Sequence, residues 1–99
     1  MGLEAAHYLE EVFTMSEYYF VQSHLFGRVS FSTYKNVDQF NHLVSIGHII
    51  DGPTTLYSGN SKKLAKYYFK IACEKSKKGQ THMRGEWMYC RESRKVVCR

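Results

Sequence analysis

Residues 62–78 read Lys-Lys-Leu-Ala-Lys-Tyr-Tyr-Phe-Lys-Ile-Ala-Cys-Glu-Lys-Ser-Lys-Lys, and this stretch decides the fold. Its apolar residues recur at the spacing of one face of an amphipathic helix, which is formed by Leu64, Ala65, Tyr68, Ile71 and Ala72. A Ser-Gly-Asn-Ser segment at 58–61 supplies the N-cap and Gly79 ends the helix. Lys62, Lys66 and Lys70 stand four residues apart on the other side. The stretch therefore predicts a helix with one buried face and one basic ridge.

Two stretches rich in aromatic and β-branched residues precede this helix, at 18–22 and 25–34. In the second stretch, apolar and polar residues alternate from Arg28 onward, as they do in a strand with one buried face. Ser23-His24 or Phe26-Gly27 provides the bend. A β-hairpin is the structure that this pattern favours.

A second helix is predicted from Asn36 to Gly47. Asn36 occupies an N-cap position with Gln39 three residues later, and Gly47 suits the C-terminal end. The turn Asp51-Gly52-Pro53 follows, and residues 54–58 read as a strand. This part of the chain therefore continues the alternation of helices and strands.

Two short strands are predicted near the C-terminal end, at 81–90 and 95–98, with Arg91 to Arg94 between them. Trp87 and Tyr89 alternate with polar residues, so we expect both in the core. Antiparallel strands joined by short turns predict an α+β fold, in which a mostly antiparallel sheet carries helices packed on one face.

The chain of 99 residues has the length of a single domain, 1–99, with no room for a second core. Residues 3–13 predict a short amphipathic helix, and residues 1–14 are a candidate for a peripheral docking helix. Met15 is an alternative to Met1 as the natural start. No apolar run reaches the length of a membrane span, and an odd number of cysteines favours a reduced, cytoplasmic setting.

Charge is distributed unevenly along the chain. Residues 1–60 contain two Lys or Arg and six Asp or Glu, whereas residues 61–99 contain twelve and three. A clustered positive field attracts anionic surfaces more strongly than the same charge spread evenly. The candidate binding residues for a protein partner or a nucleic acid are therefore the basic ones of the C-terminal part: Lys62, Lys63, Lys66, Lys70, Lys77, Lys78, Arg84, Arg91, Arg94 and Lys95.

The sequence predicts no enzyme, no cofactor and no metal site. Structural zinc sites have ligand pairs two to four residues apart, and the five histidines and three cysteines lack this spacing. Cys73, Cys90 and Cys98 are expected to be buried small hydrophobes, and the alternative is that Cys90 and Cys98 face each other across the last hairpin. His48 and Asp51 are the least poor pair for catalysis, but no motif sets them in a catalytic context.

Pro53 is the single proline of the chain and follows a glycine in a turn. A plain trans turn residue is one interpretation. A slow isomerisation switch, with a prolyl isomerase as partner, is the other.

A small, basic protein rich in Tyr, without a cofactor motif or a named nucleic-acid module, has the character of an accessory to a larger machine. In size and character it resembles the small anti-RecBCD proteins of lambdoid phages, which are early host-takeover proteins. The resemblance implies a non-catalytic role in the host–virus interaction: binding of the host helicase–nuclease complex, with inhibition of the nuclease or redirection of DNA recombination. The resemblance also implies the cytoplasm of a bacterial host cell as the location, with DNA possible near the contact and no membrane.

Two other function classes fit the same features. One is a small basic nucleic-acid-binding module that uses the same cations together with Trp87 or Tyr67. The other is a structural homo-oligomer in which the acidic N-terminal helix of one copy packs on the basic helix of another.

Overall fold

The computed structural model describes residues 16–76 and 86–99. A three-stranded antiparallel sheet forms its centre, with the order β2-β1-β3. The strands are β1 (Tyr18–Ser23), β2 (Val29–Tyr34) and β3 (Thr55–Gly59). Two helices, α2 (Val37–Ser45) and α3 (Lys62–Ser76), pack against this sheet, and a separate hairpin is formed by β4 (Trp87–Cys90) and β5 (Lys95–Cys98). The predicted α+β class with a mostly antiparallel sheet is confirmed.

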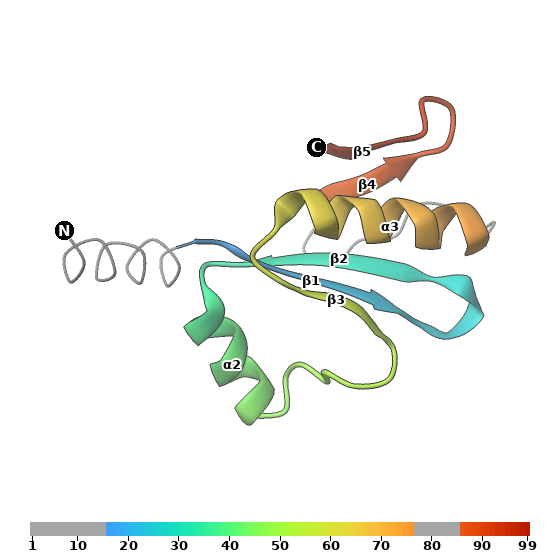
Figure 1. Ribbon diagram of the computed structural model, residues 1–99. Coiled ribbons are helices and arrows are strands. Elements are labelled where there is room, and N and C mark those ends of the chain that lie inside the picture. The colour runs from blue at the N-terminus through green and yellow to red at the C-terminus, as the bar shows by residue number, and fades with distance from the viewer. Residues whose placement is uncertain (1–15, 77–85) are drawn as a thin grey trace, which may run out of the picture.

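The two helices lie on opposite faces of the three-stranded sheet, with α3 above it and α2 below it in Figure 1. This corrects the expectation that both helices share one face. The reason lies in β1, where Tyr19 and Val21 point to one face and Phe20 to the other, and all three are buried. Because both faces of β1 are apolar, each needs its own cover. Phe40 of α2 covers Phe20, with ring centroids 5.2 Å apart.

Helix α3 buries a stripe that agrees with the predicted one at Ala65 and Ala72 but differs from it at Leu64 and Tyr68. Its fully buried residues are Ala65, Phe69 and Cys73, whereas Leu64 is 47% and Tyr68 41% exposed. The ring of Phe69 meets Phe31 of β2 edge-on, at a centroid distance of 5.5 Å. The buried face is therefore rotated towards the phenylalanine, and the lysine ridge flanks the core instead of lying opposite to it.

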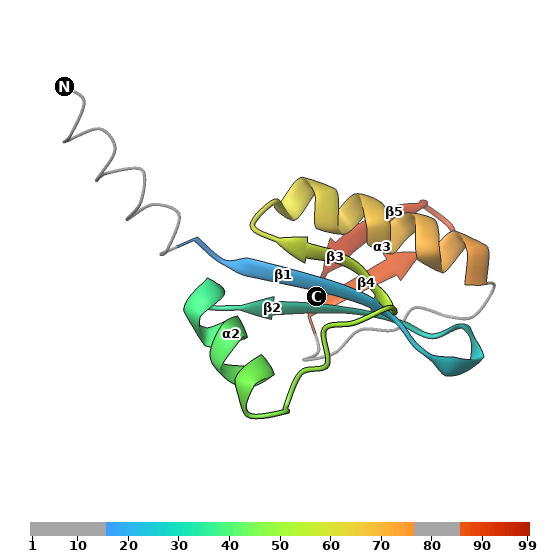
Figure 2. The same ribbon diagram turned by 60° about the horizontal axis from the view of Figure 1, so that its bottom comes forward.

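The β4–β5 hairpin packs on the same side of the sheet as α3, above the sheet in Figure 1 and partly behind α3 in the turned view of Figure 2. Trp87 and Tyr89 are 7% and 2% exposed, which confirms their predicted place in the core. The ring of Trp87 stacks on Phe31 at a centroid distance of 5.2 Å. Cys90 pairs with Lys95 and Trp87 with Cys98, so the two cysteines lie at opposite ends of the hairpin. The alternative in which they face each other is therefore wrong, and the expected burial holds for Cys73 but not for the exposed Cys98.

The predicted turns and caps are largely as expected. The bend between β1 and β2 is a 3₁₀ turn (Leu25–Gly27) in which Phe26 and Gly27 have φ angles of 63° and 74°, so β2 begins only at Val29. The side chain of Asn36 accepts a hydrogen bond from the Gln39 amide at 2.9 Å, as the capping box predicts. Gly47 ends α2 with a φ angle of 80°. The predicted helix at 3–13 lies outside the described residues.

Candidate functional site

The lysines of α3 are placed by the way the helix docks. The Ser61 hydroxyl accepts a hydrogen bond of 3.2 Å from the Leu64 amide and so caps the first turn of the helix. Because Ala65, Phe69 and Cys73 face the sheet, the row that begins at Lys62 emerges on the side of the β4–β5 hairpin. The ammonium groups of Lys62 and Lys66 each lie 4.8 Å from the centroid of the Trp87 ring. These cation–π contacts hold two lysines against the edge of the core.

A shallow groove of about 310 Å³ runs between α3 and β5. Three lysines of the helix line it on one side, and the end of the hairpin lines it on the other. Tyr67, which is 57% exposed, also lines the groove beside these cations. The full lining consists of Lys63, Lys66, Tyr67, Lys70, Arg94, Lys95 and Val96. We call this surface the basic groove.

Arg94 is the one lining cation that is paired with a carboxylate within residues 16–76 and 86–99. Its guanidinium binds Glu74 through two nitrogens, each 3.0 Å from the Oε2 atom. The Tyr89 hydroxyl donates to the same oxygen at 3.0 Å. The hydrogen bond from Tyr89, followed by that from Arg94, lowers the pKa of Glu74, so this carboxylate remains ionised. Its ion pair is with Arg94, and the charge of Lys70 also lowers the pKa of Glu74. Among these residues Lys63, Lys66 and Lys95 therefore have no carboxylate partner within ion-pair distance, and the groove keeps an excess of positive charge.

The structure brings together six of the ten predicted binding residues: Lys62, Lys63, Lys66, Lys70, Arg94 and Lys95. Arg91 lies elsewhere, because its guanidinium donates to the Cys73 carbonyl near the C-terminal end of α3 at 2.9 Å. Lys77, Lys78 and Arg84 lie outside the described residues. The sequence did not single out Glu74 or Val96, since neither carries a pattern that places it at the groove.

Pro53 is exposed, in a turn that is held by Asp51 and Thr55, whose side chains are hydrogen-bonded at 2.8 Å. The peptide bonds of the described residues are trans. The structure therefore agrees with a plain turn residue, and the isomerisation switch stays a prediction.

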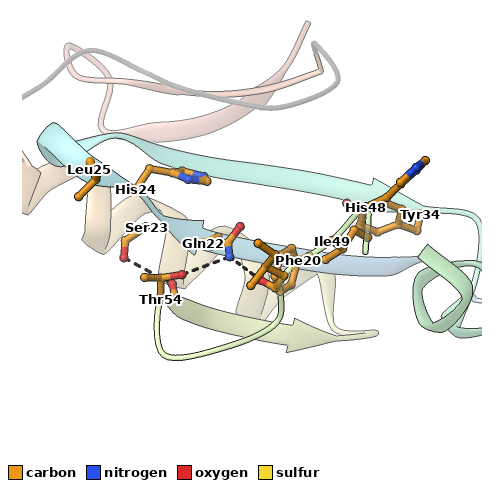
Figure 3. Close-up of a pocket in the computed structure, with 10 residues that line it drawn as sticks. Phe20, Gln22, Ser23, His24, Leu25, Tyr34, His48, Ile49 and Thr54 are labelled. Atoms are coloured by element: carbon orange, nitrogen blue, oxygen red, sulfur yellow. Dashed lines mark hydrogen bonds between the residues drawn. The ribbon is translucent and has the colours of Figure 1, made fainter. Parts of the chain in front are cut away.

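A second, larger cavity of about 550 Å³ extends from the β1–β2 bend at Leu25 along the sheet to Tyr34 and the segment after α2, and Figure 3 shows its lining. Its polar groups bind one another: the Gln22 side chain donates to the Ile50 carbonyl at 2.7 Å and to the Thr54 hydroxyl at 3.2 Å. His48 lines this cavity, whereas Asp51 accepts a hydrogen bond from Thr55. The pair considered for catalysis is thus not joined by a hydrogen bond.

Residues 16–76 and 86–99 contain no group of three His, Cys, Asp or Glu side chains that could hold a metal ion. No helix within these ranges has the length and apolar character needed to cross a bilayer.

Comparison of the chain with family models, curated proteins and solved structures finds no match. The case for a function therefore rests on the geometry and the charge of the basic groove.

Proposed function

We propose that this protein is a non-catalytic binding protein that docks its basic groove on an acidic surface of a bacterial DNA-processing helicase–nuclease. One observation carries the proposal: Lys63, Lys66 and Lys70 of α3 converge with Lys95 of β5 around the exposed ring of Tyr67. Like charges held this close repel one another, and an anionic partner relieves that repulsion. The inhibition or redirection of the nuclease would follow from occupancy of this surface.

A protein partner is favoured over bare DNA by the apolar side chains on the outer side of α3. Leu64, Tyr67 and Tyr68 are 47%, 57% and 41% exposed. Exposed tyrosines surrounded by cations are typical of the anchors of protein interfaces, whereas contacts to a phosphate backbone need only cations and polar groups. The net charge of +5 also argues against mimicry of DNA, for which a strongly acidic surface is needed.

Direct binding of a single-stranded nucleic acid is the second candidate. It is favoured by the position of Tyr67, whose exposed ring lies among cations where a base can stack on it. Such a protein would bind bare DNA with an affinity that falls steeply with salt.

Two variants, each with three substitutions, test the role of the basic groove. Lys63→Ala, Lys66→Ala and Lys70→Ala together remove three cations from the basic groove. The matched control, Arg28→Ala, Lys35→Ala and Lys75→Ala, removes three exposed cations from elsewhere. Both variants have the same net charge, so any difference between them is due to position.

The measurement is affinity capture from nuclease-treated bacterial lysate at about 0.4 M salt. At this salt concentration the Debye length is only a few ångströms, so long-range attraction between exposed charges is largely screened. We expect the wild type and the control to retain a stoichiometric helicase–nuclease complex and the groove variant to lose it. Equal retention by both variants would refute the proposal. Empty captures combined with tight binding of bare DNA at low salt would favour the second candidate.

A further inference from the structure

The outer edge of β5 carries backbone groups that point away from the hairpin. In an antiparallel ladder, every second residue exchanges hydrogen bonds with the partner strand. The Arg99 amide donates to the Glu86 carbonyl at 2.7 Å, so Val97 also faces β4. The amide and carbonyl groups of Val96 and Cys98, which alternate with these residues, therefore point outward.

This edge has no second partner strand within the described residues, because β4 and β5 form a two-stranded sheet. Figure 1 shows β5 as the strand of the hairpin that lies farther from the three-stranded sheet, and in the turned view of Figure 2 α3 crosses in front of it. The basic groove lies between β5 and α3, and Val96 belongs to its lining. An open edge of this kind is a template for a further strand.

We infer that an extended, acidic peptide segment of the partner protein adds to β5 as a third strand and lies over α3. The inference rests on the proposed function, since it names the part of the acidic partner that enters the groove. The added backbone pairs with Val96 and Cys98, and the acidic side chains on its inner face meet Lys63, Lys66 and Lys70.

A peptide strand can pair with both the donors and the acceptors at the edge of β5, whereas a phosphate backbone can pair only with the donors. The outward amide and carbonyl groups of Val96 and Cys98 offer both donors and acceptors in a regular row, which a peptide backbone matches. A phosphate backbone accepts hydrogen bonds but donates none, so it leaves the outward carbonyls unpaired. Val96, whose side chain also packs against the core, adds an apolar contact that suits a peptide side chain.

The test uses the full chain and two synthetic peptides of eight residues. The first alternates glutamate and valine, and the second has the same sequence with every second backbone nitrogen methylated. Methylation removes the strand donors and retains every charge. We expect the first peptide to slow hydrogen exchange at the amides of Val96 and Cys98, and the methylated peptide to bind at least about tenfold more weakly. Equal binding of the two peptides would overturn the inference, because charge alone would then explain the contact.

Variants at Cys98 test the edge from the side of the protein. Cys98→Pro removes an outward donor without removing a bond to β4, and proline is tolerated at such edge positions. Cys98→Ser is the matched control, because it retains the amide. We expect about tenfold weaker peptide binding for the proline variant and no change for the serine variant. If the circular dichroism of Cys98→Pro shows that its fold is lost, the comparison of the two peptides on the wild-type protein remains the test of strand addition.

The remaining outcomes separate this inference from the proposed function. Strand addition fails alone if the groove variant loses the helicase–nuclease while Cys98→Pro retains it. The proposed function fails if the groove variant retains that partner.

Two results with other occupants of the groove would also overturn the inference. The first is that neither peptide binds, while a DNA duplex of 20 base pairs shifts the NMR signals of the lysines without protecting the amides of Val96 and Cys98. The second is that the amides of Val96 and Cys98 are already protected in the free protein and lose this protection when Glu4, Glu10 and Glu11 are changed to Gln. The chain's own acidic segment would then be the occupant.

Discussion

Replacement of Phe69 with alanine tests which face of α3 is buried, and the position of the basic groove depends on that face. Phe69 is 0% exposed, and its ring meets Phe31 edge-on at 5.5 Å. Burial of a phenylalanine contributes about 1.5–3 kcal/mol, and an edge-to-face pair adds about 0.5–1.5 kcal/mol. With the cavity that remains, we expect Phe69→Ala to lower the free energy of unfolding by about 3–5 kcal/mol.

Leu64→Ala is the matched control, because Leu64 belongs to the stripe that the sequence predicted but is 47% exposed. We expect it to cost less than about 1 kcal/mol, as surface substitutions do. Urea titrations followed by far-UV circular dichroism measure both values. If Phe69→Ala leaves no folded baseline, Phe69→Leu removes fewer buried carbons and is expected to cost about 2 kcal/mol. A larger loss for Leu64→Ala than for the Phe69 variants would refute the orientation of α3, and the lysine positions with it.

Three further predictions concern local features. Asn36→Ala removes the acceptor of a 2.9 Å capping bond, and urea titration should show a loss of about 1 kcal/mol; an unchanged midpoint would contradict the cap. Lys66→Ala removes a cation 4.8 Å from the ring of Trp87, the single tryptophan of the chain, so its fluorescence should change and stability should fall by about 0.5–1 kcal/mol. Burial raises the pKa of Cys73 to about 11, so at pH 8 DTNB should label the exposed Cys98 much faster. Since unfolding releases this proton above pH 9, stability should fall as the pH rises from 9.0 towards 11, and Cys73→Ala should lack this loss.

The fold class was predictable because the local signals agree with one another. The Asn36 cap, the turn at Pro53 and the alternation around Trp87 each specify an element, and each of these elements is present. The face of α3 was not predictable, because apolar residues surround this helix and Tyr68 is adjacent to Phe69. A helical wheel does not say which aromatic ring fits against Phe31, since tertiary packing decides that.

The composition of the basic groove was predictable only in part. The clustering of cations after residue 60 singled out the lysines of α3. Their meeting with Lys95 depends on the docking of the hairpin through Trp87, a contact between residues far apart in the sequence. Arg91 has the same charge but binds the end of α3, so charge pattern alone included a residue that the groove does not contain.

Trp87 connects the stability of the fold with the geometry of the groove. Its ring stacks on Phe31 in the core, and the ammonium groups of Lys62 and Lys66 lie over the same ring. Two cations are thus ordered before any partner arrives, which reduces the conformational entropy that binding must overcome. For the same reason, replacement of Trp87 would disturb the core and the groove together and would not identify a binding role. Lys63 makes no contact with this ring among the described residues, so its loss should weaken binding while the core remains intact.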